Sequence, residues 1–174
     1  GHDLRVSVNV TVDQLQHDGF ALAVSEALFR GGLRADRLCL EITETSLARD
    51  VRAVVASIEL LRDLGVLVAV DDFGTGYSSL SYLHDLPVDE LKIDRAFVTR
   101  MVRDHRDRHL VHAIVGMGRA LGLTVVAEGV EQAEELDLLV ELGCDLAQGH
   151  LFSRPLAPDR LEPFLAARTG GVPR

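Results

Sequence analysis

Polar side chains stand at the ends of the short apolar runs in this sequence, where a buried segment would otherwise continue. The members of this set are Asn9, Glu41, Glu44, Asp71, Asp72, Lys92, Asp94, Glu128 and Gln148. Any one of them alone could be a turn residue or a helix cap. Six consecutive runs with the same pattern favour a shared functional mouth.

The carboxylates in this set predict a metal site. Carboxylates gathered in one place repel each other unless cations neutralise them. Oxygen ligands without a His or Cys cluster suit Mg²⁺ or Mn²⁺ better than Zn²⁺. The adjacent Asp71 and Asp72 could bridge two ions about 3.5–4 Å apart, which is an arrangement used for in-line attack on a phosphodiester.

Lys92 stands between Leu91 and Ile93, so in a strand its side chain points away from theirs and to the side of Asp94. Surrounding carboxylates would keep it charged, able to orient or help activate a water or to neutralise a phosphate. A structural ion pair with Asp94 is the simpler interpretation. A Schiff-base role, as in a barrel aldolase, is disfavoured because a protonated amine is a poor nucleophile.

The elements that would position these residues alternate between strands and amphipathic helices. The predicted strands are Val6–Val10, Leu38–Ile42, Val66–Val70, Leu91–Ile93, Leu123–Ala127 and a weaker one near Asp145–Gln148. One helix stripe is Val51, Val54, Val55, Ile58 and Leu61, and another is Leu110, Ile114, Met117 and Leu121. Leu64-Gly65, Leu121-Gly122 and Leu142-Gly143 read as helix ends with a left-handed glycine before the next strand.

This alternation predicts an α/β fold with a parallel sheet. An open dinucleotide-binding sheet loses its main support because no Gly-x-Gly-x-x-Gly follows the first strand. Polar residues at the carboxyl ends of the strands favour a TIM-type (β/α) barrel. About six βα units are visible, so we expect an incomplete barrel.

The composition of the chain limits the kinds of partner and the cellular compartment that we expect. The chain has 174 residues and a net charge of −9, which argues against binding a nucleic-acid polymer or an anionic membrane through general electrostatics. No apolar run is long enough to span a bilayer, and the start lacks a signal-peptide pattern. Two cysteines make no disulfide framework, so a reducing cytoplasm is expected. His105, His109 and His112 read as solvated residues of a helix face.

The segment Asp71–Leu80 is the most distinctive in the chain, and Ser78 or Ser79 within it could cap the next helix. Its Asp-Phe-Gly, together with His105-Arg106-Asp107, could suggest a protein kinase. The order of the two motifs is reversed and no Gly-rich nucleotide loop is present, so we reject that interpretation.

Taken together, the motifs resemble the EAL family of cyclic di-GMP phosphodiesterases. The matching segments, in order, are Val8–Thr11, Glu41–Glu44, Asp71–Leu80, Leu91–Asp94, Ala127–Glu131, and Gln148-Gly149 through Ser153–Leu156. The resemblance covers nearly the whole chain and is specific, since several independent motifs recur in order.

The resemblance implies a barrel that hydrolyses cyclic di-GMP to linear pGpG with two Mg²⁺ or Mn²⁺ ions. The implied metal ligands are Asn9, Glu41, Asp71 and Asp72. The implied catalytic residues are Lys92, which acts on the attacking water, Glu128 near the second ion, and Glu44, which braces the Asp71–Leu80 loop that couples the site to dimerisation. The implied substrate-binding residues are Asp94, Gln148 and Pro155.

One part of the family pattern is missing. The Glu-Ala-Leu strand that names the family would precede Asn9 and supply a further Glu ligand, followed by an Arg that contacts phosphate. We therefore expect an N-terminally truncated domain spanning residues 3–168, with residues 1–2 a tag remnant and 169–174 a tail. We expect this chain to be inactive alone, and its parent to be an active bacterial enzyme with an upstream sensor or GGDEF-type domain. Any membrane-tethering segments of the parent would lie outside this chain.

Open sheet edges at the first and last strands invite pairing with another chain, so we also expect a homodimer or a swapped assembly. The alternative function is a module that binds cyclic di-GMP, or serves regulation or dimerisation, without cleaving it. Metal-dependent hydrolysis by an N-terminally extended chain would separate the two.

Overall fold

The computed structural model describes residues 4–47, 51–75 and 80–168. Six strands in these ranges form one parallel sheet in the order β1-β2-β3-β4-β5-β6. Their bounds are β1 Val6–Asn9, β2 Leu38–Thr43, β3 Leu67–Phe73, β4 Glu90–Ile93, β5 Thr124–Ala127 and β6 Leu146–Ala147. Every strand predicted from the sequence is present. Gly1, His2 and the tail at 169–174 lie outside the described residues.

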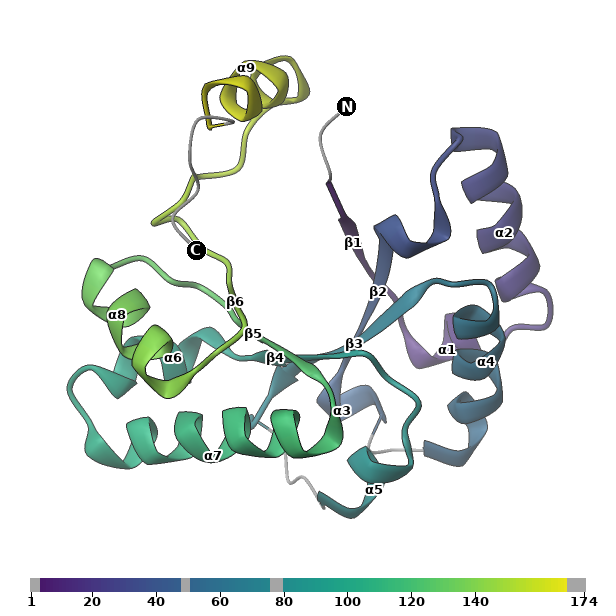
Figure 1. Ribbon diagram of the computed structural model, residues 1–174. Coiled ribbons are helices and arrows are strands. Elements are labelled where there is room, and N and C mark those ends of the chain that lie inside the picture. Colours follow the sequence, from purple (N-terminus) through teal and green to yellow (C-terminus); the bar gives the residue numbers. More distant parts are fainter. Residues whose placement is uncertain (1–3, 48–50, 76–79, 169–174) are drawn as a thin grey trace.

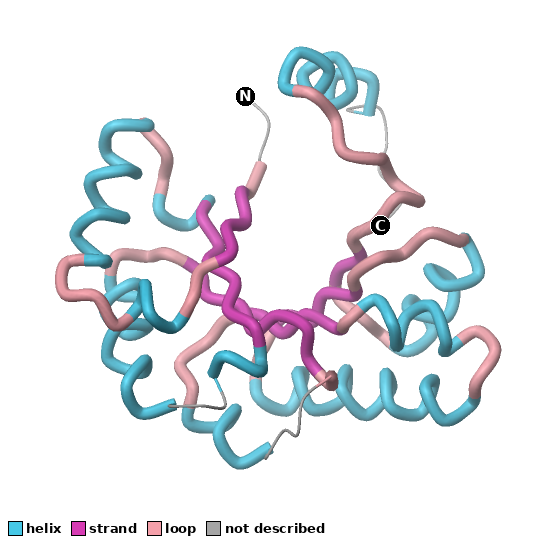
Figure 2. Tube along the Cα trace, turned by 180° about the vertical axis from the view of Figure 1, so that it is seen from behind, coloured by secondary structure: helices cyan, strands magenta, loops and turns pink. Residues whose placement is uncertain are grey.

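The sheet curls into an open arc with most of the helices on its outer side, while α9 stands apart from the sheet at the opening of the arc (Figure 1, Figure 2). The helices are α1 Val12–Leu15, α2 Phe20–Gly31, α3 Glu44–Leu47, α4 Val51–Asp63, α5 Leu80–Asp85, α6 Arg95–Met101, α7 His105–Leu121, α8 Ala133–Leu142 and α9 Pro158–Arg168, with a short 3₁₀ turn at Ala35–Arg37. Because β1 and β6 are not paired with each other, the fold is an incomplete (β/α) barrel, as the sequence predicts.

Alternate residues of each strand face opposite sides of this arc. Side chains that point outward pack under the helices and form the apolar core; they include Leu40, Ile42, Val68, Val70, Leu91, Ile93 and Val125. The opposite, concave side carries Cys39, Glu41, Asp71, Glu90 and Lys92, all of them buried. The outer face of the sheet therefore packs against the helices, and the concave face carries the buried polar and ionisable side chains.

The buried face of α7 agrees with the predicted one except at Leu110. Ile114 is buried, and Met117 and Leu121 are partly buried against the core. Leu110 is 39% exposed, and Val111, Val115 and Gly118 are buried as well. A Cβ on Gly118 would lie 2.2 Å from Val125 Cγ2, so the glycine lets α7 approach β5 closely and fixes which face turns inward. Of the predicted α4 stripe, Val54, Ile58 and Leu61 are fully buried, while the Val51 side chain is not described.

The predicted helix–strand hinges are confirmed. Gly65, Gly122 and Gly143 have φ of +88°, +73° and +76°, the left-handed conformation that glycine adopts at low cost. Each one ends a helix and turns the chain directly into a strand or its approach.

None of the helices in the described ranges is long and apolar enough to cross a membrane. His105, His109 and His112 are exposed on α7, as predicted.

Candidate functional site

The carboxyl ends of β2 to β5 bring four ionisable side chains together on the concave side. Glu41 lies in β2, Asp71 in β3 and Lys92 in β4, and Glu128 directly follows β5. Asn9, at the end of β1, is the register partner of Glu41 and therefore faces the same side of the sheet. The predicted mouth is thus assembled from strands that are far apart in sequence.

Lys92, the sole lysine of the chain, lies at the centre of this mouth. Its Nζ is 2.7 Å from Glu41 Oε1, 3.4 Å from Asp71 Oδ1 and 2.5 Å from Glu128 Oε1. The structure gives no ion pair between Lys92 and Asp94 among the described residues; Asp94 instead caps α6, its Oδ1 accepting a hydrogen bond from the Ala96 N–H at 2.8 Å. The simpler interpretation of an isolated Lys92–Asp94 pair is therefore wrong.

One ammonium group serves three carboxylates in this cluster. Burial alone would lower the pKa of Lys92, but hydrogen bonds to Glu128 and Glu41 outweigh it and hold that pKa above its ordinary value. Burial raises the pKa of Glu128, and the Lys92 ammonium offsets this only in part because Asp71 and Glu41 add negative charge nearby. A lysine held this firmly in its charged form is unsuited to Schiff-base chemistry.

Asp72 adopts a strained backbone conformation beside this cluster. Its φ is +54°, the only positive value at a described residue other than glycine, and its N–H donates to Asp71 Oδ1 at 2.9 Å. The register between β3 and β4 shifts between Val70 and Phe73, which makes room for the turn of the chain at Asp72. Burial, followed by the neighbouring Asp71 and Asp94 charges, raises the pKa of Asp72.

Asp71, Asp72 and Glu128 each offer a carboxylate oxygen within 4.8 Å of the others. All three are oxygen donors, and no His or Cys joins the group that the structure places there. Strain at Asp72 and a partly compensated negative charge are both typical of a site prepared for a cation. The residues present therefore fit divalent metal ions of the hard, oxygen-preferring kind.

Glu44 supports the loop that follows β3. Its side chain is 1% exposed, and Oε2 accepts a hydrogen bond from the Gly74 N–H at 2.7 Å. This contact agrees with the predicted bracing of the loop by Glu44. Residues 76–79, with the predicted caps Ser78 and Ser79, lie outside the described ranges.

A cavity of about 440 Å³ opens beside Glu128. Gln148 and Pro155, both predicted to bind substrate, line it. Asp94 is not among the lining residues and lies instead beside Asp72. Sequence reasoning missed four further lining residues with ionisable side chains: Arg95, Glu131, His150 and Arg154.

Arg95 and Glu131 are joined in this cavity. Arg95 Nη2 lies 2.9 Å from Glu131 Oε1, and His150 Nδ1 lies 3.5 Å from the same oxygen. Gly129, with φ of +67°, makes room for the Arg95 stem, since a Cβ there would lie 2.3 Å from Arg95 Cγ. The glycine next to Glu128 was the one sequence signal of this close approach.

The letters Glu26-Ala27-Leu28 do occur in the chain, but in α2. Glu26 is exposed there and is not on a strand. This tripeptide therefore does not supply the metal ligand expected from a strand before Asn9.

Comparison with known proteins agrees with the geometry. A sequence model described as the EAL domain matches residues 1–155. The chain is 46% identical over 168 residues to "Cyclic di-GMP phosphodiesterase NbdA" of Pseudomonas aeruginosa, covering 96% of this chain and 22% of NbdA. The chain thus spans under a quarter of the length of that relative.

Two of the solved structures that resemble this one are informative about the site. "PaMucR Phosphodiesterase, c-di-GMP complex" superposes with a TM-score of 0.87 at 44% identity, covering 92% of this chain and 66% of that one. A manganese and cyclic di-GMP complex of Klebsiella pneumoniae BlrP1 gives a TM-score of 0.81 at 35% identity, covering 87% of this chain and 39% of that one.

Proposed function

This chain belongs to the EAL domain family, and we propose that the protein of which it forms part is a cyclic di-GMP phosphodiesterase. The reaction would open the cyclic dinucleotide to linear pGpG. The observation that carries the proposal is the Lys92 cluster, in which one buried ammonium group contacts Glu41, Asp71 and Glu128 beside the strained Asp72. The substrate is inferred from NbdA, which is a cyclic di-GMP phosphodiesterase, and from the PaMucR structure, which is a complex with c-di-GMP.

Two Mg²⁺ or Mn²⁺ ions would be held by Asn9, Glu41, Asp71 and Asp72. Manganese in the BlrP1 complex and the oxygen-only donor set support this assignment. When bound, such ions supply an activated water and stabilise negative charge on the phosphoryl oxygens.

Lys92 would act directly at the reacting phosphate. Its Nζ remains protonated, so it can donate a hydrogen bond to the attacking water or to a phosphate oxygen. Glu128 and Glu41 accept hydrogen bonds from the same Nζ and so fix its direction. Gln148 and Pro155, which line the cavity, would contact the rest of the dinucleotide, and Asp94 would contact it from beside Asp72.

The test measures pGpG release by chromatography, using the protein extended to include the residues that precede this chain in its parent. Asp71→Asn and Lys92→Met are expected to reduce turnover by more than a hundredfold, while Asp63→Asn, an exposed carboxylate at the end of α4, leaves it unchanged. Turnover that survives Asp71→Asn would refute the proposal.

The 174-residue chain is expected to turn over little substrate by itself, because the family's further Glu ligand is not among its residues. Turnover by this chain at the rate of the extended protein would contradict that expectation. If the extended protein binds cyclic di-GMP without releasing pGpG, the second candidate, a binding or regulatory module, replaces the first.

A further inference from the structure

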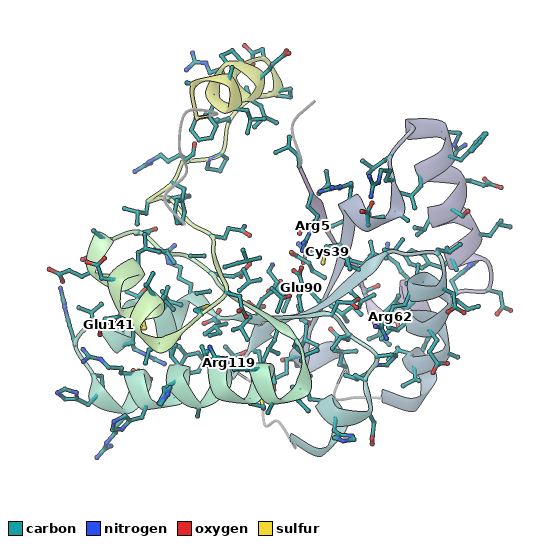
Figure 3. The ribbon with its side chains drawn as sticks, in the orientation of Figure 1. Arg5, Cys39, Arg62, Glu90, Arg119 and Glu141 are labelled. Atoms are coloured by element: carbon teal, nitrogen blue, oxygen red, sulfur yellow. The ribbon has the colours of Figure 1, made fainter. Side chains whose placement is uncertain are left out.

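Arg5 and Glu90 form an ion pair across the concave side of the sheet. Arg5 directly precedes β1, whereas Glu90 is the first residue of β4, so the pair spans the two strands between them. Figure 3 shows Arg5, Cys39 and Glu90 close together on this side. No sequence pattern links residues 85 positions apart, and the proposed function does not use this contact.

The pair lies nearer the amino ends of the strands than the candidate metal-binding residues, on the same concave side of the sheet. Arg5 and Asn9 are four residues apart on one extended segment, and Glu90 and Lys92 are two apart on another. In each case both side chains point to the same face of the sheet. The mouth and the ion pair are therefore successive layers of the same curled surface.

Apart from its pairing with β2, β1 has little packing around it. It is an edge strand whose neighbour in the described sheet is β2. Val6 and Val8, which point to its outer face, are 48% and 44% exposed, so little packing holds that side. The contact with Glu90 reaches past β2 and β3 and so links β1 to a strand with which it is not paired.

Glu90 is suited to such a tie because it is buried, with 7% of its surface exposed. Its second carboxylate oxygen lies 3.9 Å from Cys39 Sγ, a weak thiol donor. A buried carboxylate is stabilised only by a strong partner, because it has lost its hydration. The positive charge of Arg5 provides that partner for Glu90.

We infer that Arg5 and Glu90 are positioning residues, which tie β1 to β4 and thereby hold Asn9 against Glu41 at the metal-binding mouth. This role rests on the proposed function only in that Asn9 and Glu41 are taken as metal ligands. The competing interpretation is a contact that stabilises the fold and has no effect on the mouth.

A single variant that removes the Arg5 charge and a double variant that removes both charges of the pair distinguish the two interpretations. Arg5→Met leaves the Glu90 carboxylate buried without its partner, so both interpretations expect a lower melting temperature. The double variant R5M/E90Q removes that uncompensated charge and should recover most of the melting temperature. The double variant does not restore the ion pair between positions 5 and 90. A positioning role therefore predicts that Mn²⁺ binding at the mouth remains weakened although the melting temperature recovers.

The first measurement is Mn²⁺ binding by electron paramagnetic resonance, at a temperature where all variants are folded. We expect R5M/E90Q to raise the Mn²⁺ dissociation constant by about tenfold or more, the range seen for residues that support metal ligands. The exposed pair Arg34–Asp36, 2.6 Å apart, provides the matched control R34M/D36N, which should not change it. Wild-type affinity in R5M/E90Q would overturn the inference.

The second measurement needs no metal. The Val10 N–H donates to Glu41 O at 2.9 Å and reports on the pairing of β1, whereas the Thr124 N–H donates to Asp89 O at 3.0 Å and serves as a reference. In R5M/E90Q we expect faster hydrogen exchange at Val10 and not at Thr124. Unchanged exchange at Val10 would overturn the tie. If exchange at Val10 is faster in R5M/E90Q but Asp71→Asn does not weaken Mn²⁺ binding, the tie stands and the proposed metal site is overturned.

Discussion

At the scale of single residues, the molecule concentrates its buried charge in one place. Lys92 is 4% exposed, and its partners Glu41 and Asp71 are 6% and 8% exposed. A cation removed from such a cluster leaves carboxylates that cannot be solvated fully. The cluster is thus both a candidate active site and a point on which stability depends.

Lys92→Met should lower the free energy of unfolding by about 3 kcal/mol in the presence of a chelator, because it leaves buried carboxylates without their counter-charge. Adding Mn²⁺ should recover part of this loss, since a bound cation replaces the ammonium charge. Urea denaturation with and without Mn²⁺ measures both effects. Arg62→Met, which breaks an exposed pair with Asp89, is the control and should cost no more than about 1 kcal/mol. Equal stability of Lys92→Met and the unaltered protein in chelator would contradict the expectation.

The two thiols offer a separate test at this scale. Burial raises the pKa of Cys39 and of Cys144 to about 11, from an ordinary value of 9.0. At pH 8 each native thiol should therefore hold about a hundredfold less thiolate than a free cysteine and react correspondingly slowly with iodoacetamide. Mass spectrometry after timed labelling should show Cys144, which is partly exposed, reacting before Cys39, which is fully buried.

The same shifts set the direction of a pH effect. Both thiols bind their protons more tightly in the folded state, so their contribution to stability is present below about pH 9 and lost as the pH rises towards 11. Fast labelling of Cys39 in the native protein at pH 8 would contradict the expectation that this buried thiol reacts slowly.

At the scale of elements, the sequence was informative where the signal is local. Apolar runs gave the six strands, and Leu-Gly pairs gave the helix ends at Gly65, Gly122 and Gly143. The polar residues at the strand ends predicted the mouth, because parallel strands necessarily bring their carboxyl ends together. None of these inferences required knowledge of how far the sheet curls.

What the sequence could not predict depends on that curl. The partners of Lys92 lie on three other strands or strand ends, so their distances follow from the shape of the whole sheet. The Arg5–Glu90 contact is of the same kind. Leu110 was misplaced for a related reason: the close approach of Gly118 to β5 decided the rotation of α7.

Gly149 controls how the segment after β6 approaches the segment after β5. A Cβ at this position would lie 2.1 Å from Val130 O and 2.3 Å from Val130 N, both backbone atoms that cannot move aside. Gly149→Ala should therefore destabilise the protein by about 3 kcal/mol and disturb the cavity lined by Gln148 and Pro155. Chemical denaturation measures the loss.

The matched control is Gly116→Ala in α7. Nothing lies within 4 Å of a Cβ built there, and the site is exposed within a helix. This change should stabilise the protein by about 0.5–1 kcal/mol. A Gly149→Ala variant as stable as Gly116→Ala would contradict the predicted clash.

At the scale of the whole molecule, the sheet has two unpaired edges within the described residues, β1 and β6. Unpaired backbone groups beside exposed apolar side chains favour association with another strand. The predicted homodimer or swapped assembly remains a proposal, and the edge at β1 is where it can be tested.

Sedimentation of the chain should show association that increases with concentration. Val8→Lys places a charge on the β1 edge and should weaken the association. Leu22→Lys is the matched control, since Leu22 is 64% exposed on α2 away from the sheet edge and its replacement adds the same charge. A chain that sediments as a monomer at every concentration would contradict the expectation.

The composition of the mouth has one practical consequence. Because Lys92 is the only lysine, growth on ¹⁵N-labelled lysine would introduce the isotope at a single position, at the centre of the carboxylate cluster. A nuclear magnetic resonance spectrum would then contain one backbone signal from β4 and one from the ammonium group. Titration with metal or dinucleotide could be followed at the candidate reaction centre with no resonance assignment.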